Sequence, residues 1–303
     1  MSSTHQRTDS DETCVDASPL ARLPLACPLD GLPLRVSGAS LRCPEGHDFN
    51  RARQGYANVL PVQFKSSRHP GDSASMVAAR RRVLDACVFD TLSSHVCASV
   101  LAAAATVVDS APLLVDAGCG EGFHAARFAA ELRRMHGVSV FGVLGTDLSR
   151  PAILAAARRH RSLGWAVANN THLPVLQGKA GIITSMFGFE TWQPWAALQT
   201  AGQWVVVTDA GPRHLVELRE LIYPVVKLHS PPNDDAALAA GYRRIDSLSE
   251  VHMSDMLSSE CLQDLLAMTP HAYRSGAEAT DRLSEIPAMQ VTLDTVTRMY
   301  QRC

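Results

Sequence analysis

The stretch Leu113–Phe123, LLVDAGCGEGF, decides how the rest of the chain is interpreted. It starts as an apolar run that suits a buried β-strand and reaches an acidic residue, Asp116. Glycines then follow at every second position, Gly118, Gly120 and Gly122. Glycine lets the backbone turn tightly and pass close to a ligand, because it tolerates positive φ and has no Cβ. The stretch therefore predicts a strand, a ligand-binding turn and a helix, in that order.

The form of the turn indicates its ligand. Dinucleotide sites carry G-x-G-x-x-G, whereas this turn reads G-x-G-x-G after an acid. It resembles the first motif of class I S-adenosylmethionine-dependent methyltransferases, and the cationic amino-acid portion of that cofactor suits Asp116 and Glu121. Alone, the glycine pattern is equally compatible with an ordinary tight turn. Asp147 favours the cofactor site, because it ends the next strand, where a carboxylate accepts hydrogen bonds from two ribose hydroxyls. Asn169 and Asn170 end the third strand, where we expect the adenine edge.

Strands and helices alternate around this stretch. Apolar runs that read as strands lie at 112–118, 138–147, 165–170, 180–187 and 204–211. Helical patterns cover 125–134 and 151–160, and another helix is expected at 214–221. This alternation predicts an α/β domain over residues 110–303 with a parallel sheet covered on both faces. The resemblance to class I methyltransferases implies that the sheet is Rossmann-like, mostly parallel and seven-stranded.

Composition excludes several other classes. The chain has 303 residues, 46% of them hydrophobic, and a net charge of −2, so no global charge indicates nucleic acid or a membrane. No apolar run approaches the roughly 20 residues of a spanning helix. Eight cysteines are scattered along a chain that lacks the order of a signal peptide. We expect a cytoplasmic protein with free thiols, no membrane association, and a disordered tail over residues 1–24.

A second motif lies in residues 25–60, which we expect to form a small module. Cys27, Asp30, Cys43 and His47 have the spacing C-x2-D-x12-C-x3-H, that of a zinc ribbon with a carboxylate in place of one thiolate. Asp can ligate zinc at distances close to those of His, although a harder oxygen ligand weakens a thiolate site. Retention and loss of zinc both stay open at this point.

Residues 61–109 read as a basic linker followed by helices, the first of them over 76–85 with Asp72 or Ser73 as its N-cap. Between residues 42 and 82, eight Arg or Lys stand against three acids, a local charge of +5. Arginines on a helix are by default a solvated face, but beside an RNA module they suit phosphate contacts. The candidate RNA-binding residues are Arg51, Arg53, Lys65, Arg68, Arg80, Arg81 and Arg82.

From Cys27 onward the chain resembles the RlmA-type 23S rRNA guanine-N1 methyltransferases. The motifs that carry the resemblance are CPLDGLPL at 27–34, CPEGHDF at 43–49, QGYANVLPVQ at 54–63, SRHPGDSA at 67–74, DAGCGEGF at 116–123, GPRHLVEL at 211–218 and MTPHAYR at 268–274. The stretches QFKSSRHPGDSA at 63–74, AGPRHL at 210–215 and LIY at 221–223 look nearer to the Gram-negative branch than to the macrolide-resistance branch.

The resemblance implies a zinc-bearing RNA-recognition module, a class I methyltransferase domain, and a methyl group placed on N1 of a guanine in a 23S rRNA hairpin loop. It also implies a homodimer, zinc ligands at the four positions given above, and cofactor contacts at Gly120, Glu121, His214 and Phe89, where relatives have tyrosine. The segment 187–199 departs from the family pattern.

Methyl transfer to N1 requires that its proton be removed. Asp209, His214, Glu217 and Glu190 are candidate bases, with His214 and Asp209 placed first. Two other functions stay open. One is a small-molecule methyltransferase that retains the module, and the other is a non-catalytic RNA-binding protein with a degenerate fold.

Overall fold

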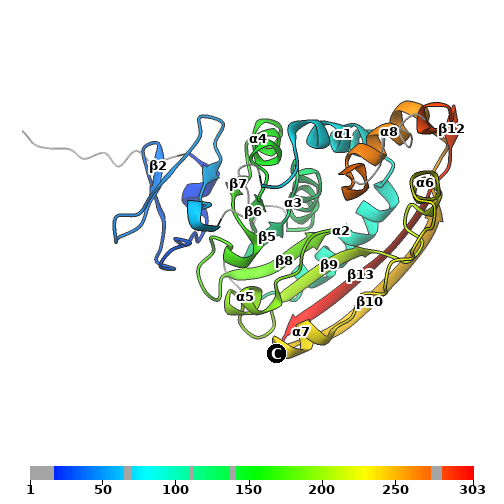
Figure 1. Ribbon diagram of the computed structural model, residues 1–303. Helices are drawn as coiled ribbons and strands as arrows, with labels where there is room; N and C mark the ends of the chain where they lie inside the picture. Colours follow the sequence, from blue (N-terminus) through cyan, green and yellow to red (C-terminus); the bar gives the residue numbers. More distant parts are fainter. Residues whose placement is uncertain (1–16, 65–69, 109–111, 137–140, 274–281) are drawn as a thin grey trace, which may run out of the picture.

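The computed structural model describes residues 17–64, 70–108, 112–136, 141–273 and 282–303. Its centre is an eight-stranded sheet with the order β10-β13-β9-β8-β5-β6-β7-β4 (Figure 1). The strands are β4 (Ala57–Asn58), β5 (Leu113–Ala117), β6 (Gly142–Asp147), β7 (Gly164–Val167), β8 (Ala180–Met186), β9 (Trp204–Ala210), β10 (Tyr242–Met253) and β13 (Thr292–Arg302).

All neighbouring strands from β4 to β9 run parallel, and β13 lies antiparallel between β9 and β10. This confirms the predicted α/β fold of class I methyltransferases. The predicted number of seven strands is wrong by one, because β4 comes from the N-terminal segment and pairs with β7. Without β4, the backbone donors and acceptors at that edge of β7 would lack strand partners.

Helices cover both faces of the sheet (Figure 1). They are α1 (Ala74–Asp85), α2 (Asp90–Ala104), α3 (Phe123–His136), α4 (Arg150–Arg159), α5 (Trp192–Ala197), α6 (Val216–Ile222), α7 (Asp235–Ala239) and α8 (Ser259–Ala267). Helices α1 to α4, α6 and α8 pack on one face, and α5, α7 and the N-terminal module pack on the other. Adjacent strand residues such as Val143 and Leu144 therefore enter different cores, which explains the continuous apolar runs of the strands.

The N-terminal module contains a three-stranded antiparallel sheet of β1 (Arg35–Ser37), β2 (Ser40–Arg42) and β3 (Asp48–Asn50). Residues 17–24, expected to belong to a tail, are part of the fold, because Leu20 in the 3-10 helix η1 (Pro19–Arg22) is only 1% exposed. The rest of the predicted tail, 1–16, lies outside the described residues. The remaining short elements are η2 (Val62–Phe64), η3 (Asn170–His172), β11 (Leu257–Ser258), η4 (Pro270–Tyr273) and β12 (Ala288–Met289).

The first residues of helices α1 and α6 determine where neighbouring candidate site residues lie. Ser73 is the N-cap of α1, since its side chain accepts a hydrogen bond from the Met76 amide at 3.3 Å. Helix α6 starts at Val216, later than the predicted 214, because Leu215 adopts a left-handed conformation with φ 53°. His214 therefore lies in the turn between β9 and α6.

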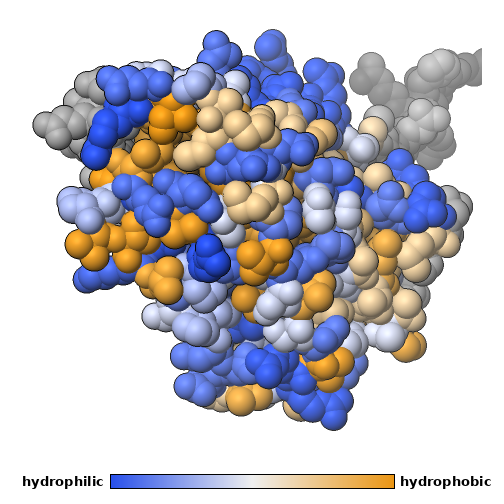
Figure 2. Space-filling model, turned by 90° about the vertical axis from the view of Figure 1, so that its right-hand side faces the viewer, coloured by the Kyte–Doolittle hydropathy of each residue, from blue (hydrophilic) through white to orange (hydrophobic). Residues whose placement is uncertain are grey.

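At the far edge of the sheet, β10 exposes Ile245, Leu248, Val251 and Met253. Figure 2 shows the side of the molecule that carries this edge, where hydrophobic residues lie among hydrophilic ones. Within the described residues, no single helix is long and apolar enough to cross a membrane. Helices α1 and α2 reach that length only together, across a bend of 88°.

Candidate functional site

The glycine-rich loop joins β5 to α3 at the carboxyl ends of the parallel strands. The amides of Gly118 and Cys119 both donate to the Thr146 carbonyl, at 2.8 and 2.9 Å. Gly118, Gly120 and Gly122 have φ values of 84°, 56° and 82°, which favour glycine. A Cβ on Gly122 would lie 2.4 Å from the Trp165 ring, so this position also has no room for a side chain.

Three carboxylates surround the loop. Asp116 is buried, accepts from the Thr184 hydroxyl at 2.8 Å, and has its pKa raised to about 7 by burial. Asp147 accepts from the amides of Gly120 at 2.9 Å and Ser149 at 2.7 Å, and burial raises its pKa as well. Each of its oxygens keeps a further lone pair for a ligand hydroxyl.

Glu121 is the third carboxylate and the one that best fits a cationic ligand. Only 2% of the residue is exposed, and its Oε1 atom has no hydrogen-bond partner in the described structure. Burial raises the pKa of Glu121 above its usual range. Because an unpartnered buried oxygen is costly, a ligand ammonium at this oxygen would remove a penalty.

The asparagines after β7 have separate roles. Asn169 uses its side-chain oxygen for a turn, accepting from the Thr171 amide at 3.0 Å. Asn170 donates to the Phe189 carbonyl at 3.2 Å, and its Nδ2 would be 4.0 Å from a Cβ on Gly118. Asn170 therefore lies beside the glycine-rich loop and is hydrogen-bonded to the segment after β8.

Three rings from distant parts of the chain gather at the same edge. Phe187 and His214 have centroids 5.3 Å apart, and Phe89 lies 6.2 Å from His214. His214 Nδ1 is 2.9 Å from the carbonyl oxygen of Asp294, and burial lowers the pKa of His214 to about 4. Because a carbonyl oxygen can only accept, Nδ1 carries the proton and Nε2 keeps its lone pair. Phe187 is 44% exposed, so this ring cluster reaches the surface.

A buried arginine links two of the predicted bases. Arg298 in β13 is 2% exposed and lies 2.5 Å from both Glu190 and Asp209. Its Nη1 also donates to the hydroxyl of Tyr300 at 2.6 Å. Arg298 was not among the predicted residues, and its signal in the sequence is a charged side chain in the middle of the strand segment TVTRMY, residues 295–300. Glu217, the fourth candidate base, accepts from the amide and hydroxyl of Thr292.

The predicted RNA-binding arginines differ in exposure and in their partners. Arg80 is half-buried and paired with Asp72 at the glycine-rich loop. Arg51 is half-buried and donates to the Gly38 carbonyl at 2.8 Å, and Arg53 is exposed. Arg81 and Arg82 are exposed and form ion pairs, Arg81 with Asp85 at 3.4 Å and Arg82 with Asp264 at 2.5 Å. Lys65 and Arg68 lie outside the described residues.

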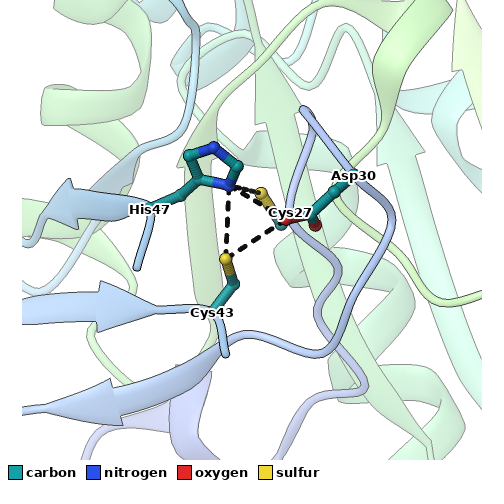
Figure 3. A group of neighbouring side chains, drawn as sticks. All are labelled: Cys27, Asp30, Cys43 and His47. Atoms are coloured by element: carbon teal, nitrogen blue, oxygen red, sulfur yellow. Dashed lines mark hydrogen bonds and ion pairs between the residues drawn. The ribbon is translucent and has the colours of Figure 1, made fainter. Parts of the chain in front are cut away.

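In the N-terminal module, the four predicted metal ligands converge (Figure 3). One ligand atom from each of Cys27, Asp30, Cys43 and His47 lies within 4.8 Å of all the others. The Nδ1 atom of His47 is 3.5 Å from Cys27 Sγ, 3.3 Å from Cys43 Sγ and 2.9 Å from Asp30 Oδ2. Tetrahedral zinc with ordinary bond lengths separates sulfur and nitrogen ligands by about 3.5 Å, so this group fits a zinc ion.

Asp30 is oriented by its own turn. Its Oδ1 accepts from the Leu32 amide at 2.9 Å, and Oδ2 faces Cys43 Sγ at 3.3 Å. The Leu32 hydrogen bond is the main reason that the pKa of Asp30 is lowered to about 2. Burial raises the pKa of the Cys27 thiol to about 11 when no metal is present. The carboxylate is thus held ionised in the position of a ligand.

Comparisons with known proteins agree with this arrangement. Residues 25–68 match the family model described as RlmA, N-terminal, a zinc ribbon. The chain is 30% identical over 274 residues to the 23S rRNA (guanine(748)-N(1))-methyltransferase of Streptomyces fradiae, covering 89% of this chain and 93% of that protein. It is 31% identical over 299 residues to a putative 23S rRNA (guanine-N(1)-)-methyltransferase of Micromonospora griseorubida, covering 91% and 95%. A relative named YxjB in Bacillus subtilis is 29% identical over 280 residues, covering 88% and 93%.

Proposed function

Because the chain belongs to the family of 23S rRNA (guanine-N1)-methyltransferases, we propose that it methylates N1 of a guanine in a hairpin loop of 23S rRNA. The observation that carries this proposal is the juxtaposition of the glycine-rich loop, the unpartnered Glu121 oxygen and the ring cluster at one edge of the sheet. The fold binds ligands at this edge, outside the carboxyl ends of parallel strands. With 23S rRNA as its substrate, the enzyme would work in the cytoplasm, which we include in the proposal. The homodimer and the Gram-negative branch remain predictions.

S-adenosylmethionine fits the residues around the loop. Glu121 would face the ammonium, Asp147 would accept from the ribose hydroxyls, and the glycines would let the cofactor approach the backbone. Asp116 would hold the end of β5 to β8 through Thr184 rather than touch the ligand. When bound, the cofactor supplies an electrophilic methyl group and a neutral thioether as the leaving group.

His214 is the residue that we assign to the N1 proton. As the methyl group bonds to N1, the N1–H bond breaks and its proton moves to an acceptor. Neutral His214 has a free lone pair on Nε2 because Nδ1 donates to Asp294. The carboxylates of Glu190, Asp209 and Glu217 are instead occupied by Arg298 or Thr292. Arg298 thereby fixes the segment after β8, which lines the rim where the base would enter.

The N-terminal module would present RNA to this edge. Zinc held by Cys27, Asp30, Cys43 and His47 would join the turn after Leu25 to the turn between β2 and β3. The module also contributes β4 to the central sheet, so it is anchored to the domain that carries the cofactor loop. Arg51 and Arg53 lie between β3 and β4 and are the predicted RNA-binding residues that the module contributes.

A single experiment tests the proposed function. The protein is incubated with labelled S-adenosylmethionine and 23S rRNA that lacks the modification, and the product is mapped by primer extension. N1 methylation blocks the Watson–Crick edge, so the polymerase should stop one nucleotide before the target guanine. Cofactor binding without rRNA labelling would instead indicate a small-molecule methyltransferase. RNA binding without cofactor binding would indicate a non-catalytic protein.

A further inference from the structure

Arg80 differs from the other arginines of α1. Arg81 and Arg82 are exposed, whereas Arg80 reaches the glycine-rich loop from the adjacent helix. A Cβ on Gly120 would lie 3.2 Å from Arg80 Nη1 and 3.8 Å from its Cδ. The guanidinium is thus next to the backbone that the cofactor has to approach.

The hydrogen bonds of Arg80 leave part of its guanidinium available. Both bonds that it makes to described residues use Nη2, one to Asp72 and one to the Met268 carbonyl at 3.5 Å. A guanidinium has five N–H donors, so Nε and Nη1 retain donors for a ligand. Nη1 is also the nitrogen that faces Gly120.

The groups around the glycine-rich loop are mostly acidic, so a zwitterionic ligand needs a positive charge near its carboxylate. Glu121 and Asp147 suit the ammonium end and the ribose of such a ligand, and the buried Asp116 is a third acid beside them. A ligand carboxylate in the same place would be repelled by these groups unless a positive charge compensates for it. Arg80 supplies that charge, and a guanidinium can hold a carboxylate with two parallel hydrogen bonds.

We propose that Arg80 is a cofactor-binding residue whose free N–H groups bind the carboxylate of the methionine portion of S-adenosylmethionine. The identity of the ligand rests on the proposed function. This role replaces the RNA-phosphate contact that the basic sequence around Arg80 suggests. Helix α1 would then contribute Arg80 to the cofactor and leave Arg81 and Arg82 on the outer surface.

The test compares two ligands that differ in this carboxylate alone, S-adenosylmethionine and its decarboxylated form. Isothermal titration calorimetry gives the dissociation constant of each. Wild-type protein should prefer the intact cofactor by about tenfold to a hundredfold, as expected for a charge-assisted hydrogen bond. Arg80→Met should lose most of that preference while binding the decarboxylated compound within about twofold of wild type.

Two matched variants separate this role from a structural one. Arg82→Met removes an exposed arginine from the same helix and should leave both dissociation constants unchanged. Asp72→Asn breaks the ion pair of Arg80 but keeps the guanidinium, so it should retain the preference for the intact cofactor. If Asp72→Asn loses the preference as fully as Arg80→Met, helix packing is responsible and the inference is overturned.

The remaining outcomes are also decisive. Unchanged binding of S-adenosylmethionine by Arg80→Met, or an equal loss for both ligands, would overturn the inference and leave the proposed function intact. Wild-type protein that binds neither ligand would overturn the proposed function and this inference with it.

Discussion

At position 214, burial and one hydrogen bond keep a histidine neutral. The pKa of His214 is lowered to about 4, chiefly by burial, while an unfolded histidine titrates near its ordinary value of 6.5. Between these two values the unfolded chain binds more protons than the folded chain. The free energy of unfolding therefore falls as the pH drops below about 6.5, and this contribution levels off near pH 4.

We expect this histidine to cost about 2 kcal/mol of stability between pH 7 and pH 5. His214→Asn removes the titrating ring and keeps an amide that can donate to the Asp294 carbonyl. Urea unfolding of both proteins at pH 7 and pH 5 gives the comparison, and the variant should lose less stability on acidification. An identical pH dependence in the two proteins would contradict a buried, neutral His214.

At the scale of the element, backbone conformation and lack of space both limit which residues the glycine-rich loop can accept. Gly122 has φ 82°, and a Cβ there would lie 2.4 Å from Trp165. Gly122→Ala should lower the free energy of unfolding by about 2–4 kcal/mol, from left-handed strain and overpacking together. Gly202→Ala is the matched control, because Gly202 has φ 86° but nothing within 4 Å. It should cost only about 1–2 kcal/mol of strain. Equal losses in chemical denaturation would show that Trp165 does not limit the loop.

Another prediction concerns the buried ion pairs that Arg298 in β13 makes. Arg298→Met would leave Glu190 and Asp209 without their buried partner, and we expect a loss of about 3 kcal/mol. Arg244→Met provides the control, since Arg244 pairs with Asp234 at 2.6 Å with 47% of its side chain exposed. That pair should contribute less than about 1 kcal/mol. Thermal and urea unfolding of both variants test the difference, and a small effect at Arg298 would argue against a buried ion-pair cluster.

These elements also show which features the sequence could predict. The loop of Gly118 to Gly122 and the strand that ends in Asp147 were predictable, because their residue types are set by local backbone geometry and by the strand period. The contact between Arg298 and Glu190 was not, because 108 residues separate them and only the sheet order brings them together. Arg80 is a similar case. Its sequence neighbours are basic, and only the packing of α1 against the loop distinguishes it.

At the scale of the whole molecule, the two parts of the chain share one core. Leu25, Leu41 and Phe49 of the module pack in the same cluster as Leu144 and Val175 of the larger domain. The strand β4 continues this connection by pairing with β7. The Val59 amide then donates to the Val167 carbonyl at 3.1 Å, and the Ala168 amide donates to the Asp147 carbonyl at 3.1 Å. The module is therefore joined to the strand ends that carry the cofactor site.

This connection predicts how the molecule responds to metal removal. Hydrogen–deuterium exchange of protein with bound zinc, before and after a chelator, should show faster exchange over residues 25–50. The change should extend to β4 and the adjacent edge of β7. It should fade before the central strands β5 and β8, which are paired along both edges and packed on both faces. Asp30→Cys replaces the carboxylate with a thiolate, so the variant should keep its zinc at higher chelator concentrations than wild type.

Protein purified without chelator that holds less than about a tenth of an equivalent of zinc would contradict a metal site with Asp30 as a ligand. Exchange that does not respond to the chelator in zinc-loaded protein would show that the buried leucines alone hold the module on the sheet.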